Sequence, residues 1–476
     1  MTTDRVRPHA DGRARWPPRD RRGPDHDLGQ RASLSEPAAA TALHATTSQR
    51  FQRNAAAIAR RALDAAADGR LAQLPVRICF WDGSRLGADD APTVVVRDRS
   101  ALVHLLRAPG QLGLARGWVD GSLDVDGDLE GVLRAGDAFN AVELSWPDRV
   151  QLALAGLRLA GPRLLRPPRV PPIEARMRGA RRSLARDRSA VRHHYDVSNR
   201  FYRLVLGPTM VYSCAYFADP TDTLEQAQER KLDLICRKLA LSENDRFLDI
   251  GCGWGSLAIH AAARYGVTAV GVTLSELQAR LARERAEEAG VADRVEIRVQ
   301  DYRELADGPF DKIASVGMYE HVGRDELCHY VSAVLGLLRP GGLFLNHGIT
   351  RLTPHAPVPD PFITRYVFPD GELHPVLDIM GEMHAAGLEI RDAESLRDHY
   401  GPTLRRWVAN LAANRDAAIA EVGPQRERVW RLYMLGSALG FETGDISVYQ
   451  VLAARPGAPH GLPLERARLL DGVSAR

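Results

Sequence analysis

The stretch Phe247–Leu248–Asp249–Ile250–Gly251–Cys252–Gly253–Trp254–Gly255 decides the fold. An apolar run ends in an acid, and three glycines at alternate positions then lead into a helical pattern. Glycine suits such a turn because it adopts unusual backbone angles and leaves no Cβ in the way of a ligand. The spacing is GxGxG, which is neither the GxGxxG of dinucleotide-binding proteins nor the GxxxxGK[ST] of phosphate loops. The turn therefore indicates a ligand at the end of a strand, and the alternative is a tight turn without one.

Segments with strand and helix patterns alternate on both sides of this turn, from residue 193 to about residue 455. The predicted strands are Arg246–Ile250, Ala269–Val272, Val295–Val299, Lys312–Val316 and Leu343–Asn346. The predicted helices between them are Ser256–Arg264, Leu274–Glu288 and Glu326–Leu338. Two later strands, Leu388–Asp392 and Ser447–Leu452, bracket long helices around residues 402–440. Such alternation predicts an α/β fold with a parallel, doubly wound, Rossmann-like sheet.

The rest of the 476 residues divides by composition. Residues 1–49 are rich in Arg, Pro, Asp and Ala without apolar periodicity, which predicts disorder. Residues 50–157 predict a small α+β domain, with a helix to about Asp68, strands at Val76–Trp81 and Thr93–Val96, and helices near 99–107 and 128–136. We expect the α/β domain at residues 193–456 and a loose tail at residues 457–476.

Residues 158–192 form a basic segment between the two domains. It holds eleven arginines and five prolines against only two acids, Glu174 and Asp187. A solvated linker stiffened by proline is one interpretation. The other is a segment that faces an anionic membrane.

The overall composition narrows the class of protein. Hydrophobic residues make up 45% and charged residues 26%, and the net charge of +3 gives no bulk signal for nucleic acid. The five cysteines are scattered without a CxxC pair, which argues against a disulfide scaffold and a cysteine zinc site. No apolar run reaches the ~18 residues of a spanning helix, so we expect a cytoplasmic protein.

The strand–DxGxGxG–helix context resembles class I S-adenosylmethionine-dependent methyltransferases. The resemblance implies that Asp249, Gly251, Gly253 and Gly255 border S-adenosylmethionine. Such enzymes usually carry an acid after the second strand for the ribose. Here the polar candidates are Thr273 and Gln278, and Gln300 and Asp301 follow the third strand where adenine usually lies.

Further motifs resemble one branch of these enzymes, the cyclopropane fatty acyl phospholipid synthases. They are His194–Tyr195–Asp196, Tyr212–Ser213–Cys214, Gly317–Met318–Tyr319–Glu320–His321–Val322–Gly323, Asn346–His347–Gly348–Ile349 and Phe368–Pro369–Asp370–Gly371. The stretch Gly113–Leu114–Ala115–Arg116–Gly117–Trp118–Val119–Asp120–Gly121 resembles the N-terminal domain of the long members, which act on phospholipids.

This resemblance implies methyl transfer from S-adenosylmethionine to the cis double bond of an unsaturated phospholipid acyl chain, giving a cyclopropane. Tyr212 and Ser213 would contact the cofactor. A bound bicarbonate would act as the base, held by Cys214, Glu320, His347, the backbone amide of Ile349, and Tyr400. For Cys214 the alternative is an inert buried thiol, and His194 either closes over the cofactor or is a core histidine.

Several alternatives stay open at this point. The family often carries a Cys before its last strand, and Ser437 stands there, so no thiol nucleophile is available at that position. The same carbocation also leads to a 10-methylene product, the precursor of a methyl-branched chain. Competing functions are methylation of a small molecule or RNA, and silent binding of lipid or cofactor. The resemblance implies peripheral association with the inner membrane face. Family members are often homodimers, for which this sequence shows no interface of its own.

Overall fold

The computed structural model describes residues 54–66, 75–140, 143–352 and 361–470. The segment 1–49, for which we predict disorder, lies outside these ranges. Of the expected tail, residues 457–470 are described and end in the short helix α17 (Ala467–Leu470). Across the described residues no helix is both long and apolar enough to cross a membrane.

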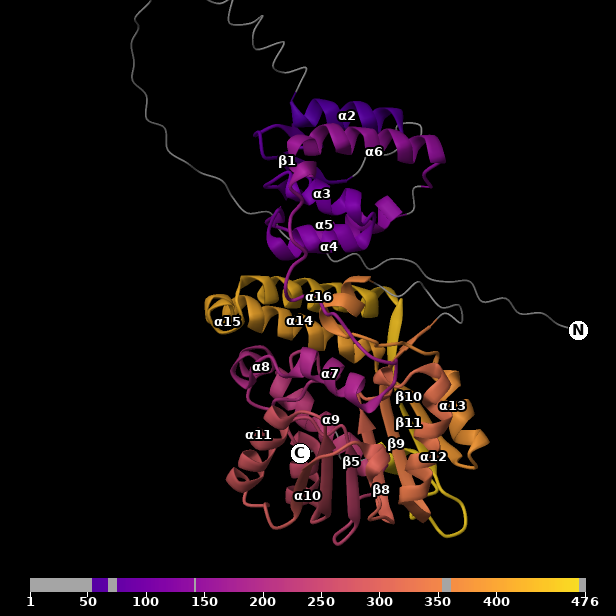
Figure 1. Cartoon of the computed structure of the whole chain (residues 1–476). Helices are drawn as coiled ribbons and strands as arrows, with labels where there is room; N and C mark the ends of the chain where they lie inside the picture. The colour runs from indigo at the N-terminus through magenta and orange to yellow at the C-terminus, as the bar shows by residue number, and fades with distance from the viewer. Residues whose placement is uncertain (1–53, 67–74, 141–142, 353–360, 471–476) are drawn as a thin grey trace, which may run out of the picture. The chain divides into compact units, whose positions relative to one another are not determined.

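The N-terminal part is the expected small α+β domain (Figure 1). Its sheet has the order β2-β1-β3-β4, in which β1 and β3 are parallel and the other pairs antiparallel. Its elements are α2 (Ala55–Ala65), β1 (Arg77–Phe80), β2 (Arg85–Leu86), β3 (Thr93–Val96), α3 (Ser100–Arg107), α4 (Gln111–Asp120), β4 (Leu123–Asp126), α5 (Leu129–Asn140) and α6 (Trp146–Ala160). The Gly113–Gly121 motif forms most of α4, an element that the periodicity did not reveal.

The catalytic part is built on a seven-stranded sheet of order β10-β11-β9-β8-β5-β6-β7 (Figure 1). Its strands are β5 (Arg246–Ile250), β6 (Thr268–Thr273), β7 (Val295–Val299), β8 (Phe310–Val316), β9 (Leu338–Arg351), β10 (Glu389–Ser395) and β11 (Ile446–Ala454). The sheet confirms the predicted Rossmann-like α/β fold. The sheet is parallel except at one strand, because β11 runs antiparallel to both β9 and β10. A strand buried on both faces reads as apolar in either direction, so its pattern does not reveal the direction.

Helices cover both faces of this sheet. One face packs on α9 (Leu224–Lys238), α10 (Ser256–Tyr265) and α11 (Glu276–Glu288). The other packs on α12 (Leu327–Leu337) and α13 (Val376–Ala385). Successive strand residues feed the two cores, with Phe247 in the first and Leu248 in the second, as the pleat of a strand requires. Further helices are α7 (Leu184–Tyr195), α8 (Asn199–Leu206), α14 (Arg397–Ala413), α15 (Arg415–Val422) and α16 (Pro424–Thr443).

The basic segment 158–192 is less of a free linker than its composition suggests. Residues 184–192 belong to α7, and Glu174 is buried in an ion pair with Arg116. Arg186 forms a bidentate pair with Asp370, and Arg182 donates to the carbonyls of His321 and Asp370. Part of the positive charge therefore holds the Phe368–Gly371 turn in place.

The two parts meet where α4 packs on α16. The indole of Trp118 donates to the carbonyl of Arg428 at 2.8 Å, and the Arg428 guanidinium lies 4.1 Å from the centre of the Trp118 ring. The same guanidinium donates to the carbonyl of Leu123 and pairs with Asp124 at 3.1 Å. These contacts place N-terminal side chains beside the catalytic part.

Candidate active site

The three glycines of the turn after β5 all adopt positive φ, at 78° for Gly251, 54° for Gly253 and 77° for Gly255. L-residues with side chains rarely adopt such angles, which explains the spacing. Gly251 and Gly253 line a pocket of about 200 Å³, and Gly255 is the N-cap residue of α10. A Cβ on Gly255 would lie 3.0 Å from Ala282, so this glycine also lets α11 pack closely.

The other cofactor candidates surround the same pocket. They are Tyr212, Ser213, Asp249, Thr273, Gln278, Gln300 and Asp301. The Thr273 hydroxyl donates to Gln278 Oε1 at 2.8 Å, which leaves the amide hydrogens of Gln278 for a ligand. Asp301 accepts from the backbone and guanidinium of Arg303, a residue that sequence reasoning did not single out. The structure thus brings the predicted set together at the carboxyl ends of β5, β6 and β7.

Glu320 lies in a short 3₁₀ turn after β8, against the end of β9. Its Oε1 accepts the backbone N–H of Ile349 at 2.7 Å, while its buried Oε2 has no hydrogen-bond partner among the described residues. Burial raises the pKa of the Glu320 carboxyl to about 7. A group with this pKa can both hold and release a proton near neutral pH.

His347 lies two residues before Ile349 on β9, so both side chains point to one face of the sheet. Gln450 of the neighbouring β11 donates its amide to His347 Nδ1 at 3.2 Å. With Nδ1 as acceptor, the ring carries its proton on Nε2, which is buried without a partner within the described part of the chain. Burial lowers the pKa of His347 well below its usual value, so the ring is neutral.

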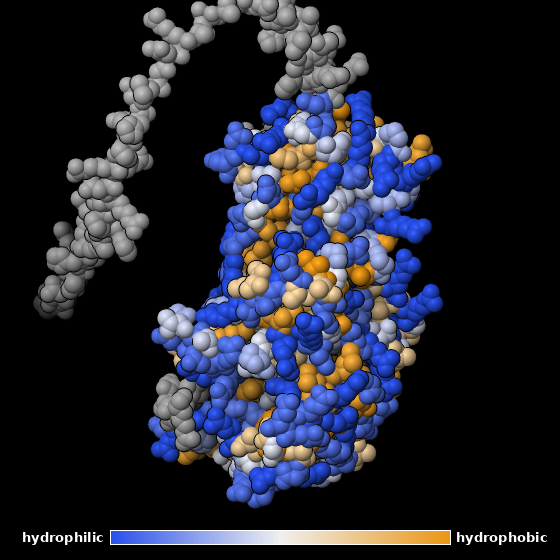
Figure 2. Space-filling model, turned by 90° about the vertical axis from the view of Figure 1, so that its left-hand side faces the viewer, coloured by the Kyte–Doolittle hydropathy of each residue, from blue (hydrophilic) through white to orange (hydrophobic). Residues whose placement is uncertain are grey.

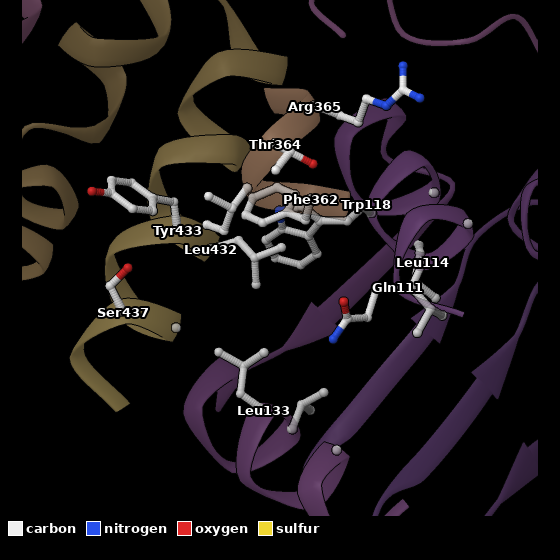
Figure 3. Close-up of a pocket in the computed structure, with 18 of the residues that line it drawn as sticks. Gln111, Leu114, Trp118, Leu133, Phe362, Thr364, Arg365, Leu432, Tyr433 and Ser437 are labelled. Carbon is white, nitrogen blue, oxygen red and sulfur yellow. The ribbon is translucent and has the colours of Figure 1, made fainter. Parts of the chain in front are cut away.

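Glu320, His347, Ile349 and Tyr400 all line a second cavity, of about 2010 Å³. Ser437, at the position where the family often has a Cys, lines it as well (Figure 3). Cys214 does not appear in its lining. The Cys214 thiol is fully buried and donates to the carbonyls of Ala215 and Leu396, and burial raises its pKa. The structure thus assembles four of the five candidates on one wall and leaves Cys214 behind it.

Aromatic rings line the region between the two cavities. Tyr195, Tyr212 and Ser213 border both of them. His194 is buried and donates its Nδ1 hydrogen to the carbonyl of Val367 at 3.0 Å, while its Nε2 lies 3.2 Å from the Tyr212 hydroxyl. Its ring stacks on Tyr212 and Trp430. His194 therefore orders the surrounding rings. Tyr433, which lies 3.3 Å from the Tyr212 hydroxyl, was not recognised from the sequence because a lone aromatic in a helix reads as core.

The larger cavity extends from this wall into the N-terminal part, and its lining is predominantly apolar. Figure 3 shows Leu114 and Trp118 of α4, Leu133 of α5, and Leu432 and Tyr433 of α16 around one space. The arrangement suits a long apolar substrate that brings one inner carbon to Glu320 and His347, beside the cofactor pocket.

Comparison with known proteins assigns the family. The model described as mycolic acid cyclopropane synthetase matches residues 182–451, more than half of the chain. The chain belongs to this family. The Rossmann-like fold and the glycine turn of this chain agree with that assignment. The chain is an S-adenosylmethionine-dependent methyltransferase of this family.

Relatives and solved structures support the assignment. A probable fatty acid methyltransferase of Pseudomonas putida is 41% identical over 402 residues, covering 83% of this chain and 95% of the relative. The cyclopropane-fatty-acyl-phospholipid synthase of Escherichia coli K12 is 36% identical over 75% of this chain and 86% of its own. The cyclopropane synthase MmaA2 of Mycobacterium tuberculosis matches with a TM-score of 0.54 and 34% identity, covering 56% of this chain and 98% of that one. The mycolic acid cyclopropane synthase CmaA1, complexed with SAH and CTAB, gives a TM-score of 0.53 at 34% identity.

Proposed function

We propose that this protein transfers the methyl group of S-adenosylmethionine to the cis double bond of an unsaturated phospholipid acyl chain and closes a cyclopropane ring. One observation carries the proposal above the others. The apolar cavity of about 2010 Å³ ends at Glu320 and His347, where it adjoins the pocket of the glycine turn. A polar acceptor such as a small molecule or RNA would not need so large an apolar space.

The chemistry explains the aromatic lining. An alkene has no lone pair, so its π electrons form the new bond to the methyl carbon while the bond from sulfur to that carbon breaks. A carbocation is left on the acyl chain. The electron-rich faces of Tyr195, Tyr212 and Tyr433 tolerate this charge, and the surrounding apolar residues keep water from trapping it.

The carbocation becomes a ring when the new methyl group loses one proton and its C–H electrons close the third bond. Glu320 Oε2 and His347 Nε2 are two buried polar atoms in the lining of this cavity that have no hydrogen-bond partner among the described residues. A protonated Glu320 and the Nε2 proton of His347 would both donate to a small anion. A bicarbonate ion held there would supply the base. Cys214 and the Ile349 amide fit this role less well, because both already have hydrogen-bond partners.

A second product is supported by the relatives. The P. putida relative is a probable fatty acid methyltransferase, and another, from M. tuberculosis, is a tuberculostearic acid methyltransferase, 36% identical over 85% of this chain. If a hydride shift precedes loss of the methyl proton, the same carbocation gives an exocyclic methylene. The site chemistry is the same for both outcomes.

Association with the inner membrane face is supported by α6. Trp146, Val150, Leu154 and Leu157 recur at helical spacing and are exposed, Trp146 by 77%. Leu152, Ala155 and Leu159 on the same helix line the large cavity. Arginines of α6 and the following residues would attract anionic lipid. Figure 2 shows one face of the molecule, where hydrophobic residues lie between polar ones.

The test is fatty-acid analysis of a bacterial host that lacks its own cyclopropane synthase, expresses this protein and is fed oleate. A new species one CH₂ heavier that resists mild hydrogenation supports the cyclopropane. A species that takes up hydrogen to give a methyl-branched chain supports the methylene product. No new species, with Glu320→Gln and the wild type alike, overturns both and favours a silent binder or another acceptor.

A further inference from the structure

A buried lysine in the cofactor pocket forms no ion pair with any residue that the structure describes. Lys231 lies on α9, is 2% exposed, and lines the pocket formed by the glycine turn. Its ammonium donates to Ser213 Oγ at 2.8 Å, and among the described residues no carboxylate lies within ion-pairing distance of it. Two of its three hydrogens are therefore left for another acceptor.

Lys238 lies two helical turns further along α9 and is a second buried ammonium, with which Lys231 can be compared. It is 1% exposed and pairs with Glu394 and, at 3.5 Å, with Asp392. A buried charge is costly unless it is paired. The contrast between the two lysines indicates that the partner of Lys231 is a bound molecule.

Ser213 adds a second donor at the same point. Its oxygen accepts from Lys231, so its own hydroxyl hydrogen is free to donate. Gln228 donates to the carbonyls of Val211 and Ser213 and so holds this segment in place. An ammonium and a hydroxyl that converge on one spot match the two oxygens of a carboxylate.

We propose that Lys231 and Ser213 bind the carboxylate of the methionine part of S-adenosylmethionine. That carboxylate is the only anionic group of the molecule, whose sulfonium and amino groups are both cationic. The ammonium of Lys231 therefore attracts one end of the cofactor and repels the other charged groups. Because Ser213 borders both cavities, this contact anchors the cofactor beside the wall of Glu320 and His347.

Burial lowers the pKa of Lys231 to about 8, so the ammonium is still protonated at neutral pH. The acidic groups that act on its charge are Cys214, Asp249 and Cys236, and burial raises the pKa of each of them, that of Asp249 to about 7. Lys231 does not line the large cavity, which argues against a role in holding the lipid.

The test is calorimetric titration, without lipid, of the wild type and Lys231→Met with S-adenosylmethionine and with decarboxylated S-adenosylmethionine. Hydrogen bonds to charged groups correspond to about 10- to 100-fold in affinity. The wild type should prefer the carboxylated ligand by about this factor, and Lys231→Met should lose the preference while binding the decarboxylated ligand about as well as the wild type does.

Lys238→Met is the matched control, because it removes a buried ammonium from the same helix and should retain the preference. Lys231→Arg should recover part of it. The proposal is overturned if the wild type does not distinguish the ligands, or if Lys231→Met weakens both equally. Because no lipid is present, either result leaves the proposed acyl-chain reaction to be judged separately.

Discussion

Glu320 and His347 share three properties: each is buried, each is hydrogen-bonded to a neighbour on one side, and each has one polar atom without a partner within the described ranges of the chain. Ile349 and Gln450 provide the fixed side. Burial of an unsatisfied polar atom costs about 1–3 kcal/mol. Two such atoms on one cavity wall fit the small anion proposed above, which would accept a hydrogen bond from each of them.

The Glu320→Gln variant should lose methyl transfer and gain stability at alkaline pH. The Glu320 pKa is raised from 4.5 to about 7, so the native state holds this proton more tightly than the unfolded chain does. The stability of the wild type therefore falls as pH rises through this window. Relative to the wild type, the variant should gain about 2 to 3 kcal/mol between about pH 5 and about pH 8, measured by urea denaturation.

If the free energy of unfolding of the variant differed from that of the wild type by the same amount at both pH values, the raised pKa of Glu320 would be contradicted. Asp249, whose pKa is also about 7, titrates in both proteins and cancels in the difference.

Most of the residues that the structure gathers at this candidate site could be singled out from the sequence, because each lies in a contiguous motif. Glu320, His347 and Ile349 follow predicted strands, and the carboxyl ends of parallel strands meet at one edge. Lys231 was missed because a lysine in a helix reads as a surface residue. Cys214 belongs to a motif with Ser213, yet its thiol points to backbone carbonyls, a direction that no motif reveals.

At the scale of elements, the close packing of β9 on the turn that carries Glu320 depends on Gly348. A Cβ built there would lie 2.0 Å from the ring of Tyr319 and 3.4 Å from Glu320 Oε2. The ring and the carboxyl would both have to move.

Gly348→Ala should therefore destabilise the protein by about 1–3 kcal/mol and reduce activity more than it reduces affinity for S-adenosylmethionine. Denaturation and cofactor titration measure the two effects. Gly336→Ala is the control, since nothing lies within 4 Å of its Cβ and alanine favours a helix interior. Equal behaviour of the two variants would argue against this role of Gly348.

The exposed face of α6 makes a separate prediction. Replacing Trp146 and Leu154 with serine removes apolar surface without touching the cavity lining. Binding to anionic vesicles, measured by flotation, should weaken at least about tenfold while affinity for S-adenosylmethionine stays the same. Unchanged flotation would contradict this role of α6. The exposed face would then be expected to contact a second copy of the chain, and light scattering would detect the dimer.

The positions of helices and strands could be predicted where the local sequence pattern determines them. They could not be predicted where pairing between distant strands determines them. The strands β5 to β9 were placed within a few residues, except that β9 extends to Leu338–Arg351. The antiparallel β11 follows from its insertion between β9 and β10, which only the whole sheet determines. The helix α7 was hidden by the charge and proline content around it.

For the whole molecule, the substrate cavity depends on contact between its two parts. Leu114, Trp118 and Leu133 supply walls from the N-terminal domain, and α16 supplies the facing wall (Figure 3). Arg428 joins them through Trp118, Leu123 and Asp124.

Arg428→Met should therefore lower stability by about 1–3 kcal/mol and reduce turnover of lipid, while affinity for S-adenosylmethionine is unaffected. Limited proteolysis should cut more readily between the two parts. Arg264→Met, which breaks an exposed pair with Glu229, should cost less than about 0.5 kcal/mol. A loss of cofactor affinity in Arg428→Met would place the effect in the catalytic part instead.

In the most direct measurement, the purified protein is incubated with vesicles of an oleoyl phospholipid and with S-adenosylmethionine whose methyl group is fully deuterated. Whether a ring or a methylene forms, the new carbon must lose one hydrogen. Mass spectrometry should find a phospholipid acyl chain that has gained one carbon with two of the three deuterium atoms, and none with Glu320→Gln. A product that keeps all three would contradict loss of the methyl proton, and with it both the ring and the methylene. Label in no acyl chain would contradict methyl transfer to the double bond.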